Sequence, residues 1–107
     1  MKVVVILNQA SGTLSDPANR EILIEALRNA GLDATVISIT NGAEIPPAVR
    51  PHLENSDCQS IVAAGGDGTI NAVASLLIGT AMPLGVIPGG TLNHFAADLH
   101  IPSGLVE

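Results

Sequence analysis

The residues best suited to chemistry are a run of glycines around one carboxylate, in the segment 63–71 (Ala-Ala-Gly-Gly-Asp-Gly-Thr-Ile-Asn). Glycine is used where the backbone takes a positive φ or where a ligand approaches it closely. A helix beginning at Thr69 would direct its unpaired N–H groups and the positive end of its dipole at this turn. The segment therefore predicts an anion site. The alternative is a structural glycine turn that ends a buried strand.

Two standard phosphate-binding fingerprints do not fit this turn. The sequence has no Gly-Lys-Ser or Gly-Lys-Thr, so it lacks a Walker A motif. Read as a dinucleotide fingerprint, Gly66-x-Gly68 is followed by Asn71 where a third glycine is required, and no acidic residue between Asp67 and Asp98 could bind a ribose hydroxyl. An ordinary NAD-binding role is therefore disfavoured.

Composition limits the partners. A chain of 107 residues is one domain, and because 47% of it is hydrophobic and 1% aromatic, its core must consist of Val, Ile, Leu and Ala. A net charge of −6 with four basic residues argues against nucleic acid as a partner. A bound phosphate would be held by backbone amides, hydroxyls and a metal ion. The solitary Cys58 excludes an internal disulfide and suits a reducing, cytoplasmic setting.

Strand and helix signals alternate along the whole chain. The helix after the first strand has Asp16 as N-cap, Pro17 at its first position and an apolar stripe that includes Ile22. The second helix is expected to be irregular or late-starting, because it contains Pro46, Pro47 and Pro51. Strands are expected at 2–7, 34–39, 59–64 and 84–87, and helices at 17–30, 43–55, 69–79 and 93–99.

This alternation predicts an α/β fold, a doubly wound, mostly parallel, Rossmann-like sheet with helices on both faces. In such sheets ligands bind outside the carboxyl ends of the strands. All the expected strands end in loops rich in Ser, Thr, Asn or Gly. Several such loops at one sheet edge support a phosphate site more strongly than the single glycine turn does.

Three motifs carry a resemblance to a known family. They are Asn-x-x-Ser-Gly at 8–12, Gly-Gly-Asp-Gly-Thr-x-Asn at 65–71 and Pro-x-Gly-Thr-x-Asn-x-Phe-Ala at 88–96. In this order, each after an expected strand, they resemble the catalytic domain of diacylglycerol kinases and related bacterial lipid kinases and sphingosine kinases. NAD kinases are more distantly similar. The resemblance covers essentially the whole chain.

The resemblance implies that the chain binds ATP and Mg²⁺. Asn8, Ser11 and Gly12 would border the phosphates, Thr40 would lie beside the nucleotide, and Thr91 would lie opposite the main loop. Asp67 would bind Mg²⁺, directly or through water, or would help to deprotonate the acceptor hydroxyl, and the metal role is favoured. The implied nucleotide-binding residues are Asn8, Ser11, Gly12, Thr40, Gly65, Gly66, Asp67, Gly68, Thr69, Asn71 and Thr91.

The chain departs from the family pattern at several positions. Ala72 stands where many members carry a glutamate, and His94 occupies the aspartate position of the third motif. These missing carboxylates bear on metal geometry more than on nucleotide binding. His94 is either a site contact or a polar residue at a helix start, and His52 is expected to be solvated. The other departures are Gln9 for proline and Ala97 for arginine.

Lipid kinases of this family normally add a C-terminal β-rich domain that binds the lipid. Residues 1–107 are therefore interpreted as the nucleotide-binding domain, with the lipid-binding domain absent. The expected function is to hold ATP while its γ-phosphate is transferred to a lipid hydroxyl such as that of diacylglycerol. The chain alone is expected to be inactive. A non-catalytic nucleotide-sensing module, an NAD kinase-type phosphotransferase and a vestigial scaffold are the alternatives.

The same interpretation sets the expected partners and location. The lipid acceptor would be reached through the absent domain, so the longer protein would be cytoplasmic with peripheral contact to a membrane. Apolar residues near the chain end, Ile101, Leu105 and Val106, would be left exposed and would favour a homodimer.

Overall fold

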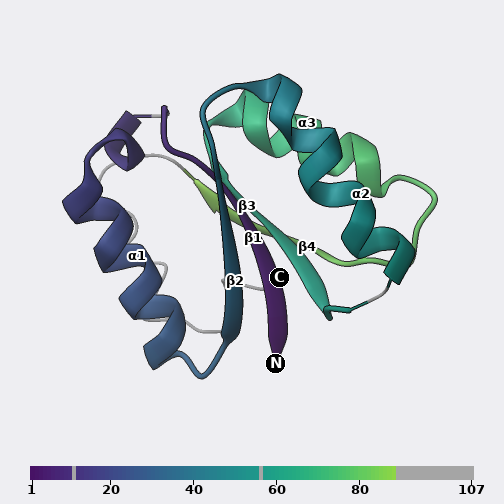
Figure 1. The fold of residues 1–107 in the computed structure, drawn as a ribbon, viewed down its shortest axis with the longest axis horizontal. Helices are drawn as coiled ribbons and strands as arrows, with labels where there is room; N and C mark the ends of the chain where they lie inside the picture. Colours follow the sequence, from purple (N-terminus) through teal and green to yellow (C-terminus); the bar gives the residue numbers. More distant parts are fainter. Residues whose placement is uncertain (11, 56, 89–107) are drawn as a thin grey trace.

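The computed structural model describes residues 1–10, 12–55 and 57–88, which form one parallel sheet flanked by helices (Figure 1). The strands stand in the order β2-β1-β3-β4, and every neighbouring pair is parallel. The doubly wound α/β fold is thus confirmed. The expected helix at 93–99 and the apolar residues of the chain end lie outside the described ranges. The strands are β1 (Lys2–Asn8), β2 (Asp33–Ile39), β3 (Ser60–Gly65) and β4 (Leu84–Pro88).

The side chains of β1 alternate between two hydrophobic cores. Val3, Val5 and Leu7 pack on the face covered by α1 (Pro17–Asn29), together with Leu23 and Leu27 of that helix. The other face of the sheet is covered by α2 (Ile45–Asn55) and α3 (Asp67–Leu77), as Figure 1 shows. A strand buried on both faces has to be apolar throughout, which explains the continuous β-branched run near the N-terminus.

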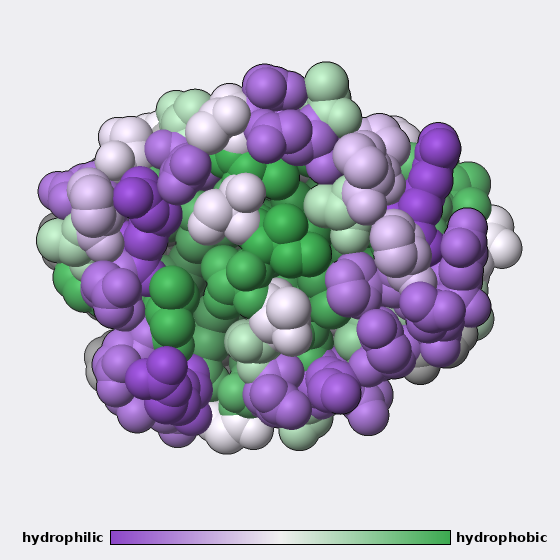
Figure 2. All heavy atoms as spheres, in the orientation of Figure 1, coloured by the Kyte–Doolittle hydropathy of each residue, from purple (hydrophilic) through white to green (hydrophobic). Residues whose placement is uncertain are grey.

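On the face seen in Figure 2, hydrophobic residues gather in the middle, where the strands lie, and hydrophilic residues surround them on the sides formed by the helices. The buried hydrophobic residues of the described core are all Val, Ile, Leu and Ala, as the composition predicts. Among the helices within the described ranges, none is long and apolar enough to cross a membrane.

Helix α1 begins where the sequence predicts, but one residue of its predicted apolar stripe does not face the core. The Asp16 carboxylate accepts a hydrogen bond from the Ala18 N–H, and Pro17 takes the first helical position. Ile22, however, is 45% exposed. Leu23 and Leu27, four residues apart, face the sheet, and Ile22 lies roughly 100° from Leu23 around the helix, so it points away from the core.

Helix α2 is more regular than its prolines predicted. It begins at Ile45, directly after the short 3-10 turn η2 (Gly42–Glu44), and continues through Pro51 to Asn55. Pro51 lacks an N–H for the carbonyl four residues earlier, but Val49, before it, is buried in the core, and Leu53, after it, packs against the same core. Tertiary packing therefore keeps the helix intact, and the expectation of a late start was wrong.

The order of the strands creates a crevice at one edge of the sheet. The chain leaves β1 for β2 on one side and later returns to β3 on the other side. The connections from β1 and β3 therefore diverge at their carboxyl ends, which is where doubly wound sheets bind ligands. In the sheet register Asn8 pairs with Ile39, and Leu7 pairs with Ala64, so these ends lie at one level.

The N-cap of α1 can be tested by substitution. We expect Asp16→Ala to lower the free energy of unfolding by about 1 kcal/mol, because the Ala18 N–H loses its partner. Asp16→Asn keeps an acceptor oxygen and is expected to retain most of that stability. Urea denaturation of the three proteins measures the difference. Equal losses in both variants would show that the cap hydrogen bond is not the source of the stability.

Candidate functional site

Helix α3 begins at the glycine turn, two residues earlier than expected. Gly66 is its N-cap, in an extended conformation (φ −81°, ψ −176°), and the first i to i−4 hydrogen bond runs from the Ile70 N–H to the Gly66 carbonyl. Asp67 therefore lies in the first turn, where a negative charge is favourable, and it is exposed. Because glycine has no side chain, the N-cap residue itself leaves the first N–H groups of the helix uncapped.

The glycines of this turn have two different roles. A Cβ added at Gly65 would lie 2.9 Å from Thr69 Oγ1 and 3.0 Å from Thr69 Cβ, so Gly65 is required by packing. A Cβ added at Gly66 or Gly68 would have no atom of the described residues within 4 Å, and neither residue has a positive φ. Neither conformation nor packing against the described part of the chain demands glycine at these two positions. Their bare backbone is open to an incoming ligand.

The Asn8 side chain joins the two sides of the crevice. Its Nδ2 donates a hydrogen bond of 3.0 Å to Thr69 Oγ1, and its Oδ1 accepts one of 2.9 Å from the Ala10 N–H. One amide thus fixes both the loop after β1 and the first turn of α3. Thr69 is 5% exposed, so this connection is largely shielded from water.

A hollow of about 380 Å³ opens at this point of the sheet edge. Four predicted residues line it, since Asn8, Gly66, Gly68 and Thr69 come together from β1 and α3. The remaining described lining comes from η2 and the start of α2, at Gly42 and Ile45, which the sequence did not single out. Gly42 follows an expected strand, so the rule that placed the other loops at the site could have found it. The full described lining is Asn8, Gly42, Ile45, Gly66, Gly68 and Thr69.

Other predicted residues are not part of the described lining of the hollow. Thr40 is exposed, and its hydroxyl donates a hydrogen bond to Glu44. Asn71 is exposed on α3, and Gly12 is the first residue of the 3-10 turn η1 (Gly12–Ser15). Asp67 is held between two lining glycines with its carboxylate exposed. Ser11, Thr91 and His94 lie outside the described residues.

Glu44 fixes the corner between β2 and α2. Its Oε2 accepts hydrogen bonds from the Thr40 N–H (2.7 Å), the Thr40 hydroxyl (3.0 Å) and the Asn41 N–H (2.9 Å). The Asn41 side chain in turn accepts from the Ala43 N–H, which completes a capping box. The Thr40 N–H contributes most to lowering the pKa of Glu44, followed by the Asn41 N–H and the Thr40 hydroxyl.

The donors around the hollow suit a phosphate group. The first turn of α3 presents N–H groups beside open glycine backbone, and the described lining carries no acidic side chain that would repel an anion. Mg²⁺ fits less specifically, because within the described ranges no three His, Cys, Asp or Glu side chains gather around one point. Asp67 alone suits the common arrangement in which one carboxylate, water and phosphate oxygens share the ion.

Ala72 is a departure from the family pattern that the structure places away from the hollow. Its side chain is partly buried and packs on the core that α2 and α3 share with the sheet. A position on that core contributes to packing, so the alanine there is compatible with an unchanged phosphate turn.

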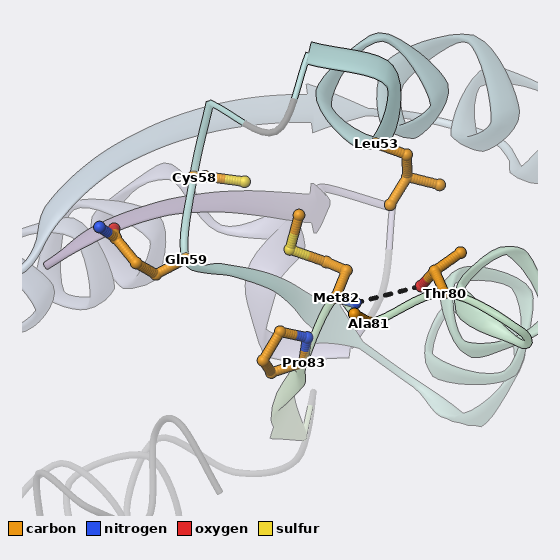
Figure 3. A pocket seen from close by; sticks show the side chains of 7 residues that line it. All are labelled: Leu53, Cys58, Gln59, Thr80, Ala81, Met82 and Pro83. Carbon is orange, nitrogen blue, oxygen red and sulfur yellow. Dashed lines mark hydrogen bonds between the residues drawn. The ribbon is translucent and has the colours of Figure 1, made fainter.

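A second hollow, of about 300 Å³, lies at the opposite edge of the sheet, where β3 and β4 begin (Figure 3). Leu53, Cys58 and Met82 extend toward a common space. The Thr80 hydroxyl donates to the Leu77 carbonyl and accepts from the Met82 N–H, so it is already satisfied. Burial raises the pKa of the Cys58 thiol, which disfavours the reactive thiolate. Nothing in this hollow matches the chemistry of the first.

The same edge carries a histidine that the sequence placed in solvent. His52 is 20% exposed, and its Nδ1 lies 2.9 Å from Asp57 Oδ1, an interaction that lowers the pKa of the Asp57 carboxyl. The pair links the end of α2 to the segment before β3. It is a structural contact remote from the carboxyl ends of the strands, and the expectation of a solvated His52 was wrong.

Comparisons with known proteins bear on the family and the fold of the chain. The sequence matches the diacylglycerol kinase catalytic domain family over residues 2–107. It is 36% identical over 95 residues to a Klebsiella pneumoniae protein named "Probable lipid kinase YegS-like", covering 87% of this chain and 31% of that protein. A protein of the same name from Cronobacter sakazakii is 45% identical over 97 residues, covering 82% of this chain and 31% of that protein. The chain thus spans about a third of the length of these relatives.

Solved structures show the same fold. A crystal structure of a diacylglycerol kinase from Bacillus anthracis matches 98% of this chain and 37% of its own, with a TM-score of 0.69 and 25% identity. The solution structure of a phosphate-loop protein matches with a TM-score of 0.60 at 14% identity, covering 91% of this chain and 87% of its own. At that identity, the second likeness shows the fold alone.

The two glycine roles predict losses of stability of different size for the same substitution. Gly65→Ala forces its methyl group against Thr69, so we expect the free energy of unfolding to fall by roughly 1–3 kcal/mol. Gly66→Ala is the matched control. Its methyl group meets no atom of the described residues within 4 Å, so the expected loss is only that of exchanging glycine for alanine at an N-cap, about 0.5–1 kcal/mol. Thermal and urea unfolding would contradict this reading if the two variants were equally destabilised.

The Glu44 network predicts a pH-dependent contribution to stability. The folded pKa is lowered, so the contribution is fully present above the ordinary value of 4.5 and is lost as the pH falls through the lowered value. We expect the Tm of the wild type to exceed that of Glu44→Gln at neutral pH, and the gap to close as the pH falls below 4.5 and through the lowered pKa of Glu44. A gap of constant size would show that the ionised carboxylate contributes nothing. Glu54→Gln, an exposed change near the end of α2, is the control.

Proposed function

Because the chain belongs to the diacylglycerol kinase catalytic domain family, we propose that it is the ATP-binding domain of a lipid kinase. In the complete enzyme the γ-phosphate of ATP would pass to a lipid hydroxyl, such as that of diacylglycerol. The observation that supports ATP as the ligand is the turn at the start of α3. Its N-cap is a glycine, and the backbone at Gly66 and Gly68 is open, so N–H donors face the hollow where a phosphate chain would lie.

The residues of the hollow would act mainly by positioning. Asn8 fixes Thr69 and the loop after β1 against each other, so donors from two parts of the chain keep a constant separation. Phosphoryl transfer gains most from such positioning and from charge neutralisation. A bound Mg²⁺ would neutralise charge on the phosphates. Asp67, on the first turn of α3 beside the hollow, is the residue we assign to hold it, directly or through water.

The acceptor site is proposed to lie outside this chain. The hollow is bordered by backbone, one amide and one hydroxyl, and the described lining offers no apolar surface suited to an acyl chain beyond Ile45. We propose that the lipid is bound by a further domain in the longer protein, which would work in the cytoplasm and meet its acceptor at a membrane surface. The chain alone would then bind ATP without phosphorylating lipid. A homodimer through the chain end remains part of this proposal.

Nucleotide sensing without phosphoryl transfer is a second candidate function. It is favoured by the scarcity of carboxylates, since the described lining of the hollow has none and Asp67 is exposed beside it. A sensor would bind ATP with the same turn but would depend little on Mg²⁺. Metal dependence therefore separates the two functions.

Calorimetric titration with ATP tests the proposal. We expect wild-type protein to bind ATP more tightly with Mg²⁺ than without it. Gly66→Ala should raise the Kd by roughly tenfold, because its methyl group enters the open space beside the turn while the fold is retained. No detectable binding by folded wild-type protein up to millimolar ATP would contradict the proposed function.

Asp67→Asn isolates the metal role. We expect this variant to lose roughly tenfold in ATP affinity when Mg²⁺ is present. Without Mg²⁺ it should bind ATP at least as tightly as the wild type, since a carboxylate that repels the phosphates has been removed. Glu54→Gln removes a charge of the same sign near the far end of α2 and should change neither value. An Asp67→Asn variant with unaltered Mg²⁺ dependence would remove Asp67 from the metal role, whereas wild-type ATP binding that does not depend on Mg²⁺ would favour the sensing function.

A further inference from the structure

The hollow has two walls of different chemistry. One wall is the start of α3, with N–H donors and open glycine backbone at Gly66 and Gly68. The other wall is the corner after β2, where Gly42 contributes backbone and Ile45 contributes an edge of an apolar side chain. The first wall suits phosphate oxygens. The second carries no charge among its described lining residues, so it suits the uncharged part of a nucleotide.

The second wall is fixed at both of its ends. On one side Ile45 is 1% exposed and packs in the core beneath α2 and α3. On the other side the Glu44 carboxylate gathers the Thr40 and Asn41 N–H groups and the Thr40 hydroxyl on one oxygen. The turn η2 also contacts α3, so the two walls share a boundary. Gly42 lies between these anchors, and its position depends on both.

Of the two anchors, Glu44 can be tested by substitution, because changing it leaves the hydrophobic core filled. Ile45 is buried, so its truncation would leave a cavity. Glu44 uses its side chain to hold backbone N–H groups that would otherwise be solvated, and it lies in the corner without lining the hollow. Glu44 can therefore affect a ligand only by positioning the other residues of the corner.

We propose that Glu44 is a positioning residue for the nucleotide: it holds the corner formed by Thr40, Asn41 and Gly42 against the uncharged part of the ligand. This inference rests on the proposed function, because it takes the phosphates to lie at α3. It assigns Glu44 no contact with the ligand. The carboxylate is stabilised in its ionised form by its three hydrogen-bond donors, which lets a negative charge remain next to a site for anions.

The test compares ATP with inorganic tripolyphosphate, a ligand that has the phosphates and lacks the nucleoside. We expect Glu44→Ala to weaken ATP binding by roughly tenfold. Tripolyphosphate binding should stay within about twofold of wild type, because the α3 wall is untouched. Glu44→Gln keeps an acceptor oxygen and is expected to retain most of the ATP affinity. Glu54→Ala, near the far end of α2, controls for loss of negative charge.

The direction of the change in ATP affinity distinguishes a positioning role of Glu44 from a simple electrostatic effect of its charge. Removing a negative charge near an anionic ligand would by itself tighten binding. Tighter or unchanged ATP binding by Glu44→Ala would therefore overturn the inference and leave the proposed function standing. Equal weakening of both ligands, with a lowered Tm, would reveal general destabilisation and would also overturn it. Failure of folded wild-type protein to bind either ligand would overturn the proposed function itself, and the inference with it.

Discussion

The site depends on how closely α3 approaches the end of β3. Gly65 has no side chain, and this lets Thr69 lie against its backbone in space that a Cβ would occupy. From that position Thr69 Oγ1 accepts the hydrogen bond from Asn8 that crosses the crevice. A wider separation would remove the link between β1 and α3 and with it the fixed spacing of the donors. The steric requirement at one glycine therefore sets the geometry of the phosphate turn.

The rest of the molecule holds that geometry without using charge. Strand β1 is buried on both faces by aliphatic side chains from three helices, and close-packed interiors of this kind resist deformation. With four basic residues and a net charge of −6, the chain cannot attract a triphosphate by its overall field. In the proposed function, recognition would therefore have to be local, through oriented N–H groups and a metal ion. The composition is rich in aliphatic and poor in basic residues, and this accounts both for the rigid scaffold and for a site made of backbone groups.

The structural features that depend on local sequence pattern were predicted correctly, and those that depend on packing were not. Strand positions, the Asp16 cap and the convergence of Asn8 and Thr69 follow from periodicity and from the parallel order of the strands. The continuity of α2 through Pro51 could not be read, because burial on either side outweighs the local defect. Glu44 could not be assigned either, because its role requires knowing that the corner after β2 meets α3.

The N-termini of helices α1, α2 and α3 are capped in different ways, and the difference affects helix stability. In parallel sheets of this type each helix begins near the carboxyl edge, so all three direct positive dipole ends toward it. Asp16 satisfies α1, and Asn41 with Glu44 satisfies the turn that leads into α2, but the N-cap of α3 is a glycine. A glycine in place of a side-chain cap costs a helix a few tenths of a kcal/mol. In the proposed function a bound anion would supply the missing acceptors, so this small deficit of the free domain would be recovered as affinity for the ligand.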